Sequence, residues 1–308
     1  MKRFEWIATM GALAAAAVAP RAIAQELTPL DVAYAGSMGS MMEGPVKTGV
    51  AQSLGIAMHG RAQGSDALAK LIVGGSIPAD VFIPVTPGPM QTVLTAGKAH
   101  VGTPIARTEM VIAYSPKSQY AKQFADAAAG KHGAMPWYEI LQQPGVRFGR
   151  TDPATDPQGR NIIFTLQLAQ TYYKQPGLAN KILGDAVNTT QIFSEATVEA
   201  RLQSGELDAA SAYRIQPGPF NLPYISLPDE INLGNESMHE RYQEASLVLA
   251  GKTYHPQALV YYACIINGSA HADKAAAFVQ WLTDTAGQRI FRQYAYDPPT
   301  GAVALRAS

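Results

Sequence analysis

Two aspartates, each followed by proline, stand in the most polar stretch of the chain, Gly149–Asn161, which reads Gly-Arg-Thr-Asp-Pro-Ala-Thr-Asp-Pro-Gln-Gly-Arg-Asn. Residues 146–148 before it are typical of the end of a strand, and residues 162–169 after it carry apolar side chains at helical spacing. Asp-Pro pairs and a glycine cannot continue a strand, so they predict a turn that runs into a helix. Open α/β sheets bind ligands beyond the carboxyl ends of strands and beside helix N-termini. We therefore expect Asp156 to contact a ligand, although an aspartate before proline is also a common turn residue.

Two serines follow strand-like segments in a similar setting. Residues 30–35 predict a strand that ends at a Gly-Ser-Met-Gly-Ser sequence containing Ser37, and residues 56–60 predict a strand shortly before Ser65. Apolar residues at helical spacing follow Ser65, which makes it the candidate N-cap of a helix. Small residues and hydroxyls at such turns can donate hydrogen bonds to an anion. Two converging turns of this kind would form an oxyanion site with neutral donors and no arginine, but an ordinary turn and helix cap is an equally good interpretation of Ser37.

The elements that would position these side chains alternate between strands and helices, which predicts an α/β fold. Further strands or extended segments are expected over residues 80–85, 108–114, 190–193, 207–213, 224–228, 231–233, 247–249 and 258–266. Further helices are expected over residues 137–141, 162–173, from Ser194-Glu195 to a stop at Gly205, over 273–282 with Ala276, Phe278, Val279 and Leu282 facing the core, and from Gly287 onward.

The first 24 residues have the pattern of a signal peptide. Lys2 and Arg3 precede an apolar, alanine-rich run over residues 6–19, and Ala22-Ile23-Ala24 matches a cleavage site. The run is too short to span a bilayer stably, and no cysteine follows it to carry a lipid anchor. We therefore expect an exported, soluble, periplasmic protein that begins near Gln25.

The composition excludes several other classes of function. Lys and Arg number 24, as do Asp and Glu, and no basic stripe suggests nucleic-acid binding. The single cysteine, Cys264, cannot form an internal disulfide and lies in an apolar run, so it predicts a buried structural thiol. No His/Cys cluster has metal-ligand spacing. An exported serine hydrolase is the enzyme alternative, but the sequence has no G-x-S-x-G elbow and no recognisable order of Ser, His and Asp.

Taken in order, several stretches resemble the substrate-binding proteins of molybdate and tungstate ABC importers, and most closely their archaeal-type, tungstate-binding branch. The central stretch is Gly149-Arg150-Thr151-Asp152-Pro153-Ala154-Thr155-Asp156-Pro157-Gln158-Gly159. The others are residues 34–37, 63–65, 107–114, 137–141, 202–208 and 227–233, and together they cover most of the chain after residue 24.

The resemblance implies a two-lobed periplasmic-binding-protein fold of type II, with the ligand in a cleft between lobes. Lobe one would comprise residues 25–106 and 263–308, lobe two residues 114–224, and the crossing or hinge segments residues 107–113 and 225–262. It also implies a monomeric binding protein rather than an enzyme, with no cofactor and with the permease/ATPase complex of an ABC importer as partner. Delivery to a sensor kinase is an alternative that the sequence does not separate from transport.

By the same resemblance, two serines, an aspartate, a glutamate and a tyrosine hold the oxyanion. The matching residues are Ser37, Ser65, Asp156, Glu195 and Tyr213. Glu199 is an alternative to Glu195, and Asp152 an alternative to Asp156. Each also has a structural interpretation: the helix dipole favours Glu195 at a first helical position, and Tyr213 fits a half-buried aromatic with its hydroxyl in solvent.

Two carboxylates in an oxyanion site need a special chemistry. At partial screening a carboxylate close to an anion is repelled by about 4 kcal/mol. Asp156 and Glu195 make sense there if they bond to the metal centre itself and raise its coordination above four, which molybdenum and tungsten allow and sulfur and phosphorus do not readily allow. The pair would therefore select a metal oxyanion over sulfate.

The chain departs from the family pattern beside the expected pocket. The family often follows Pro-x-Gly with Tyr-Arg, whereas Gly159 is followed by Arg160-Asn161. Ser37 is followed by Met-Gly-Ser, so Ser40 could replace or supplement it. Another anion, an organic acid or a ferric complex is therefore an alternative ligand.

Overall fold

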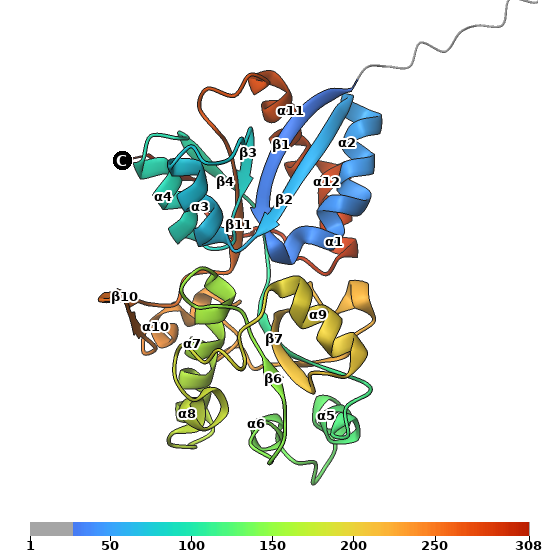
Figure 1. Ribbon diagram of the computed structural model, residues 1–308, viewed down its shortest axis with the longest axis vertical. Coiled ribbons are helices and arrows are strands. Elements are labelled where there is room, and N and C mark those ends of the chain that lie inside the picture. The colour runs from blue at the N-terminus through green and yellow to red at the C-terminus, as the bar shows by residue number, and fades with distance from the viewer. Residues whose placement is uncertain (1–26, 308) are drawn as a thin grey trace, which may run out of the picture.

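The computed structural model describes residues 27–307, so the expected signal peptide over residues 1–24 lies outside the described residues. Two lobes follow one another along the long axis of the molecule, and each is built on its own sheet (Figure 1). Lobe one holds a six-stranded sheet and lobe two a four-stranded sheet. The alternation of strands and helices confirms the predicted α/β class.

The sheet of lobe one has the strand order β12-β4-β11-β3-β1-β2. Its strands are β1 (Thr28–Ala35), β2 (Ile56–Gln63), β3 (Val81–Ile83), β4 (Val101–Arg107), β11 (Val260–Ile265) and β12 (Leu305–Arg306). The first three are mutually parallel, while β11 runs antiparallel to both β3 and β4. Side chains therefore alternate between two apolar layers: on β11, Tyr262 and Cys264 face one layer and Tyr261 the other.

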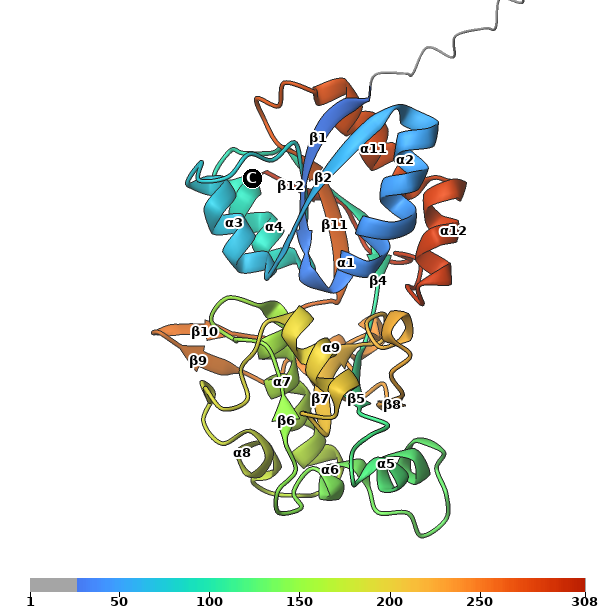
Figure 2. The ribbon, with the colours of Figure 1, turned by 45° about the vertical axis from the view of Figure 1, so that its right-hand side comes forward.

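Helices cover both faces of this sheet. Figures 1 and 2 show α3 and α4 on one side, and α2, α11 and α12 on the other. The helical segments are η1 (Gly36–Met38), α1 (Gly39–Met41), η2 (Met42–Val46), α2 (Lys47–Leu54), α3 (Ser65–Val73), α4 (Pro87–Thr95), α11 (Ala272–Thr283) and α12 (Thr285–Gln293). Cys264, on β11, is buried in one of the two apolar layers, as its apolar surroundings predict.

The sheet of lobe two has the order β6-β7-β5-β8, with β7 and β5 as its inner strands. Its strands are β5 (Met110–Tyr114), β6 (Phe148–Gly149), β7 (Ala209–Tyr213) and β8 (Tyr224–Ser226). The helical segments are α5 (Ala121–Ala128), α6 (Trp137–Ile140), α7 (Pro157–Tyr172), α8 (Leu178–Leu183), α9 (Glu195–Ser204) and η3 (Gly218–Phe220). On β5, Val111 and Ala113 face the apolar layer under α9, and Met110 and Ile112 face the layer under α7.

The chain passes between the sheets twice. Thr108 and Glu109 join β4 to β5, and residues 227–259 lead from β8 back to β11. The return segment holds η4 (Glu236–Met238), α10 (His239–Tyr242) and a hairpin of β9 (Leu247–Leu249) and β10 (Lys252–Tyr254). The exact lobe and hinge boundaries stay a prediction.

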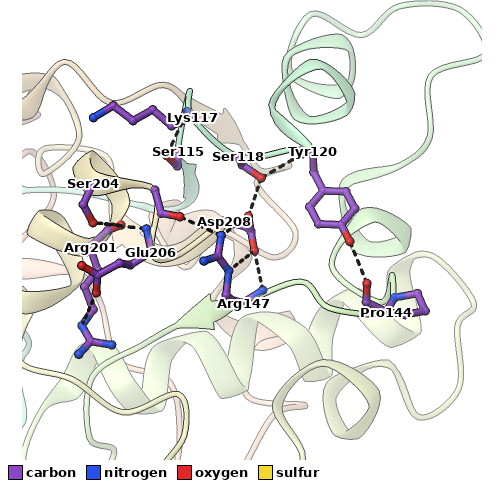
Figure 3. Close-up of polar contacts among 11 residues, drawn as sticks. Ser115, Lys117, Ser118, Tyr120, Pro144, Arg147, Arg201, Ser204, Glu206 and Asp208 are labelled. Carbon is purple, nitrogen blue, oxygen red and sulfur yellow. Dashed lines mark hydrogen bonds and ion pairs between the residues drawn. The ribbon is translucent and has the colours of Figure 1, made fainter.

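An ion pair between a buried carboxylate and a half-exposed guanidinium joins separate segments of lobe two. Asp208, just before β7, is 1% exposed on its side chain, and it accepts hydrogen bonds from Arg147 Nε at 2.9 Å and from Ser118 Oγ at 2.7 Å. Figure 3 shows Arg147 and Ser118 converging on this carboxylate from separate segments. Burial alone would raise the pKa of Asp208, but the bonds from Arg147 and Ser118 outweigh it and hold that pKa below its ordinary value.

Four local expectations were wrong. Residues 190–193 form no strand, because only Ile192 pairs, in a single parallel bridge to Arg150. Strand β2 continues past residue 60 to Gln63, since its backbone pairs with β1 along its whole length although its last five residues are exposed. In α11 the buried stripe runs through Ala275, Phe278, Trp281 and Leu282, so the stripe includes Trp281 and leaves Ala276 exposed. Residues 231–233 are not extended, and Leu233 has a φ of 61° in a turn.

Candidate functional site

A cavity of about 640 Å³ lies between the lobes, where the turn after β1 faces the start of α9. Lobe one contributes Gly36, Ser37, Gly39, Ser40, Met41, Ala62, Gln63, Gly64, Ala67, Tyr294 and Tyr296, and lobe two contributes Thr151, Asp152, Thr155, Asp156, Ile192, Phe193, Ser194, Glu195, Ala196, Glu199, Ile215, Gln216, Pro219 and Phe220. Within residues 27–307, the cavity lining includes four acidic side chains and no Lys, Arg or His. Such a lining supplies hydroxyls and carboxyls but no cation to balance them.

Asp156 is the N-cap of α7, which begins at Pro157 and not at residue 162 as expected. Its Oδ1 accepts a hydrogen bond from the Gln158 N–H at 2.9 Å, and the residue is 6% exposed. Burial raises the pKa of Asp156 to about 6, against the lowering effect of the Gln158 N–H and of the Arg160 charge. One carboxylate oxygen is committed to the helix, and the residue lines the cavity.

Asp152 also lines the cavity but has a turn role. Its Oδ1 accepts from the Ala154 N–H at 2.9 Å, two residues along the chain, which is the geometry of an Asx turn. Asp156, which is the more deeply buried, is the better candidate of the two for a ligand contact.

Glu195 reaches from lobe two to the backbone of lobe one. Ser194 caps α9 by accepting from the Thr197 N–H, which places Glu195 at the first helical position, as expected. A Cβ added to Gly36 would collide with Glu195 Oε2, so only glycine permits this approach. Burial raises the pKa of Glu195 well above its ordinary value, and the nearby charges of Asp156 and Glu199 raise it further.

Glu199 lies one turn further along α9 and also lines the cavity. Burial raises its pKa to about 7, and a hydrogen bond with Gln216 acts in the opposite direction. The structure therefore brings both glutamates to the same wall. Glu195 contacts lobe one as well, which favours it as the residue that a ligand between the lobes would meet.

Ser37 lines the cavity, whereas Ser65 does not. Ser37 Oγ lies 2.9 Å from the Tyr261 hydroxyl, and Ser40 lies on the wall nearby. The prediction that Ser65 is an N-cap was wrong: Gly64 holds that position, and Ser65 is the first residue of α3. Its Oγ is 1% exposed and accepts from the Val85 N–H at 3.1 Å, so this hydroxyl joins the helix to the segment after β3.

Tyr213 ends β7 directly beneath the cavity without lining it. It is fully buried, and its hydroxyl accepts from Asn161 Nδ2 at 3.0 Å, so the alternative of a half-buried ring with its hydroxyl in solvent was wrong. Burial raises the pKa of Tyr213 well above its ordinary value, and the neighbouring charge of Asp156 adds to the effect. The hydroxyl therefore stays protonated beside the carboxylates.

Sequence reasoning missed the tyrosines of lobe one. Tyr261, on β11, and Tyr296, after α12, are 0% and 4% exposed, and their rings pack edge to face at 5.3 Å between centroids. Burial raises the pKa of both hydroxyls well above the ordinary value, and the charge of Glu195 raises both further. A buried tyrosine hydroxyl needs a polar partner. The position of Tyr261 within an apolar run could therefore have indicated a hydrogen bond inside the protein. Tyr296 gave no comparable signal.

The two lobes are in direct contact on one flank of the cavity. Arg160 of lobe two pairs with Asp66 of lobe one at 2.5 Å, and the Ala67 N–H donates to the Thr155 carbonyl at 3.3 Å. The Arg160 guanidinium also lies 4.7 Å from the ring centroid of Tyr254. Its charge is therefore neutralised by Asp66 outside the cavity.

Comparison with known families covers nearly the whole of this two-lobed arrangement. A family model described as "Bacterial extracellular solute-binding protein" matches residues 30–297. The chain belongs to this family of extracellular solute-binding proteins.

Individual relatives of this solute-binding protein are named for oxyanions. A molybdate/tungstate-binding protein WtpA of Pyrococcus abyssi is 31% identical over 221 residues, which are 65% of this chain and 62% of the relative. The chain thus spans about six-tenths of the length of such curated relatives.

Solved structures confirm the fold. The Azotobacter vinelandii periplasmic molybdate-binding protein matches with a TM-score of 0.57 at 18% identity, over 87% of this chain and 98% of that one. The sulfate-binding protein SubI of Mycobacterium tuberculosis matches with a TM-score of 0.62 at 12% identity, over 89% and 88%. The solute-binding protein has the two-lobed periplasmic-binding-protein fold of type II, as predicted.

The described part of the chain has neither a cluster of metal ligands nor a membrane-spanning helix. Between residues 27 and 307 no three His, Cys, Asp or Glu side chains are grouped so as to hold a metal ion. Over the same residues, no helix has the length and apolar character needed to cross a membrane.

Proposed function

We propose that the protein is an exported, periplasmic binding protein that captures tungstate or molybdate between its lobes and delivers it to the permease/ATPase complex of an ABC importer. The observation that carries the proposal is that two carboxylates, Asp156 and Glu195, share a cavity wall that carries no cationic side chain among the described residues. The molybdate/tungstate-binding relative supports it. The protein would act as a monomer, without a cofactor and without catalysing a reaction.

The lining argues for a metal oxyanion over a purely hydrogen-bonded one. A carboxylate repels each unit of negative charge on an anion by about 4 kcal/mol at 4 Å even with an effective dielectric constant of 20. Bonding of Asp156 and Glu195 oxygens to tungsten or molybdenum would convert this repulsion into coordination. Sulfur and phosphorus do not readily accept two further ligands, so sulfate and phosphate would meet the repulsion without the gain.

Neutral donors would surround the oxyanion oxygens. Ser37 contributes a hydroxyl from lobe one, and Ser40 lies beside it. Tyr213 adds a protonated hydroxyl from beneath, close to Asp156. A ligand that bonds to Ser37 on one lobe and to Glu195 on the other would favour the closed arrangement over an open one.

Thermal melting of the ligand-stripped protein tests the proposal. Tungstate, molybdate, sulfate, phosphate and ferric citrate are each added well above an expected dissociation constant. A ligand at about 100 times its dissociation constant stabilises the folded state by about 2.7 kcal/mol, which a melt resolves. We expect shifts with tungstate and molybdate alone. A shift with none of the five, or only with another one, would overturn the proposed ligand.

Three alanine variants test the assigned carboxylates. Asp156→Ala and Glu195→Ala should each weaken tungstate binding much more than Glu199→Ala, measured by isothermal titration calorimetry. Unchanged binding in both of the first two variants would remove the coordination model. A larger loss in Glu199→Ala than in Glu195→Ala would transfer the role to Glu199.

A further inference from the structure

Three buried tyrosines stand at or near the cavity and come from both lobes: Tyr296 lines it, whereas Tyr213 and Tyr261 do not. Tyr213 ends β7 in lobe two, whereas Tyr261 on β11 and Tyr296 after α12 belong to lobe one. All three are at most 4% exposed, so none of these rings can swing into solvent. Tyr261 differs from the other two because its hydroxyl is bonded to a side chain on the cavity wall, Ser37, at 2.9 Å.

The Ser37–Tyr261 bond constrains where the serine proton points. A serine hydroxyl has one proton and two lone pairs. If Ser37 donates its proton to Tyr261, it can offer a bound oxyanion only lone pairs, which repel it. If Tyr261 donates instead, the Ser37 proton is free to turn toward the cavity. An oxyanion, which only accepts, therefore selects the second arrangement.

We propose that Tyr261 is a positioning residue for ligand binding: its buried O–H donates to Ser37 Oγ and turns the Ser37 proton toward the oxyanion. The inference rests on the proposed function, since it assumes an anionic ligand beside Ser37. Neighbouring residues hold the Tyr261 side chain in this position. Its ring is held edge to face against Tyr296, and its backbone bridges to Val85.

The Tyr261 proton is also kept in place by its neighbours. Burial raises the pKa of Tyr261 well above its ordinary value, with Glu195 and Asp156 adding to it. The hydroxyl thus remains a donor at neutral pH and does not become a competing anion. Without that donor, Ser37 would have to bond the ligand from a freely rotating hydroxyl.

A double-mutant cycle tests the inference on the full-length mature protein. Tyr261→Phe keeps the ring and removes only the hydroxyl, so tungstate binding by calorimetry should weaken about fivefold to tenfold. Ser37→Ala should weaken binding at least as much. Because Tyr261 acts through Ser37, adding Tyr261→Phe to Ser37→Ala should change the dissociation constant by less than about twofold.

Tyr34→Phe is the matched control. Tyr34 is buried in the same lobe, and its hydroxyl donates to Glu43 Oε1 at 2.6 Å without lining the cavity. Its loss should lower the melting temperature and leave the affinity unchanged. If Tyr34→Phe weakens binding as much as Tyr261→Phe, the effect is general destabilisation and the positioning role is wrong.

The remaining outcomes separate the inference from the proposed function. Multiplicative effects of Ser37→Ala and Tyr261→Phe, or wild-type affinity in Tyr261→Phe, would overturn the inference while tungstate binding stands. If the wild-type protein binds another of the five anions, the double-mutant cycle is run with that anion. In that case the proposed ligand is wrong and the inference about Tyr261 is still tested. If the wild-type protein binds none, both fail.

Discussion

Two sets of buried carboxylates in lobe two have opposite surroundings. Asp208 accepts hydrogen bonds from Arg147 and Ser118, and its pKa is held below the ordinary value. Asp156 and Glu195 lie on a cavity wall without a cationic lining side chain among residues 27–307, and their pKa values are raised. The Asp208 carboxylate thus has a cationic partner, whereas the cavity lining around Asp156 and Glu195 supplies none.

The difference indicates what each set is for. A buried charge without a partner destabilises a fold, so it persists where another function requires it. The Asp208 pair joins segments that are distant in the sequence (Figure 3). The cavity carboxylates join nothing that would need a charge, since Asp156 could cap α7 equally well as asparagine. The comparison therefore predicts opposite consequences for equivalent substitutions.

The largest expected effect is on binding. Asp156→Asn retains the helix cap but removes the charged oxygen that would coordinate the metal. Tungstate affinity should fall about 1000-fold, equal to about 4 kcal/mol, while the free energy of unfolding changes by less than about 0.5 kcal/mol. Calorimetry and urea unfolding measure the two quantities. An affinity within threefold of wild type would mean that Asp156 is only a cap.

Asp208→Asn should show the reverse pattern. Weakening the hydrogen bonds from Arg147 and Ser118 should lower the free energy of unfolding by about 1–2 kcal/mol, because the half-exposed Arg147 guanidinium stays hydrated. Tungstate affinity at a temperature where the variant is folded should stay within twofold. If Asp208→Asn instead lost tungstate affinity without losing stability, the contrast between the two sets of carboxylates would be wrong.

The pH dependence of stability should follow the raised pKa values. The pKa is about 6 for Asp156 and about 7 for Glu199, both above the ordinary carboxyl values, so between about pH 5 and pH 7 the folded state binds more protons than the unfolded chain. The free energy of unfolding of the ligand-free protein should therefore fall as pH rises through this window, by on the order of 1 kcal/mol per unit. Urea unfolding of wild type and Glu199→Gln should show a shallower slope in the variant. Identical slopes would refute the assignment to Glu199.

The smallest expected effect concerns the contact between lobes. Asp66→Asn removes the ion pair with Arg160, so the closed state should open more readily and the tungstate dissociation rate should rise about fivefold, equal to about 1 kcal/mol. Stopped-flow competition measures that rate. Asp126→Asn is the control, because it breaks ion pairs with Lys122 and Lys131 within one lobe and should leave the rate unchanged. If the tungstate dissociation rate were the same in Asp66→Asn and Asp126→Asn, the Asp66–Arg160 ion pair would have no role in closure.

Much of the site could be predicted because it depends on local signals. Ser194 before Glu195 is a helix-start pattern, and α9 begins where it predicts. The turn before α7 was also predicted, but this helix begins at Pro157, five residues before the expected range. The strands β5 and β7 follow from their apolar runs. These features are fixed by a few neighbouring residues and need no tertiary information.

The remainder depends on which segments meet in space. Ser65 looked like a cap, but a tertiary bond to Val85 N–H takes its hydroxyl. Tyr261 belongs to an apolar run whose alternation says only that the ring is buried, not that Ser37, more than 200 residues earlier, would meet it. The Asp66–Arg160 pair likewise joins distant segments, and residues 190–193 form no strand because only Ile192 pairs, with Arg150.

X-ray absorption spectroscopy of the tungstate complex tests the central claim most directly. If Asp156 and Glu195 bond to the metal, the tungsten of the wild-type complex should have more than four oxygen neighbours, and Glu195→Gln should reduce that number. A regular four-coordinate tungstate in the wild-type complex would contradict the account, because the unbalanced carboxylates would then face the anion without bonding to it.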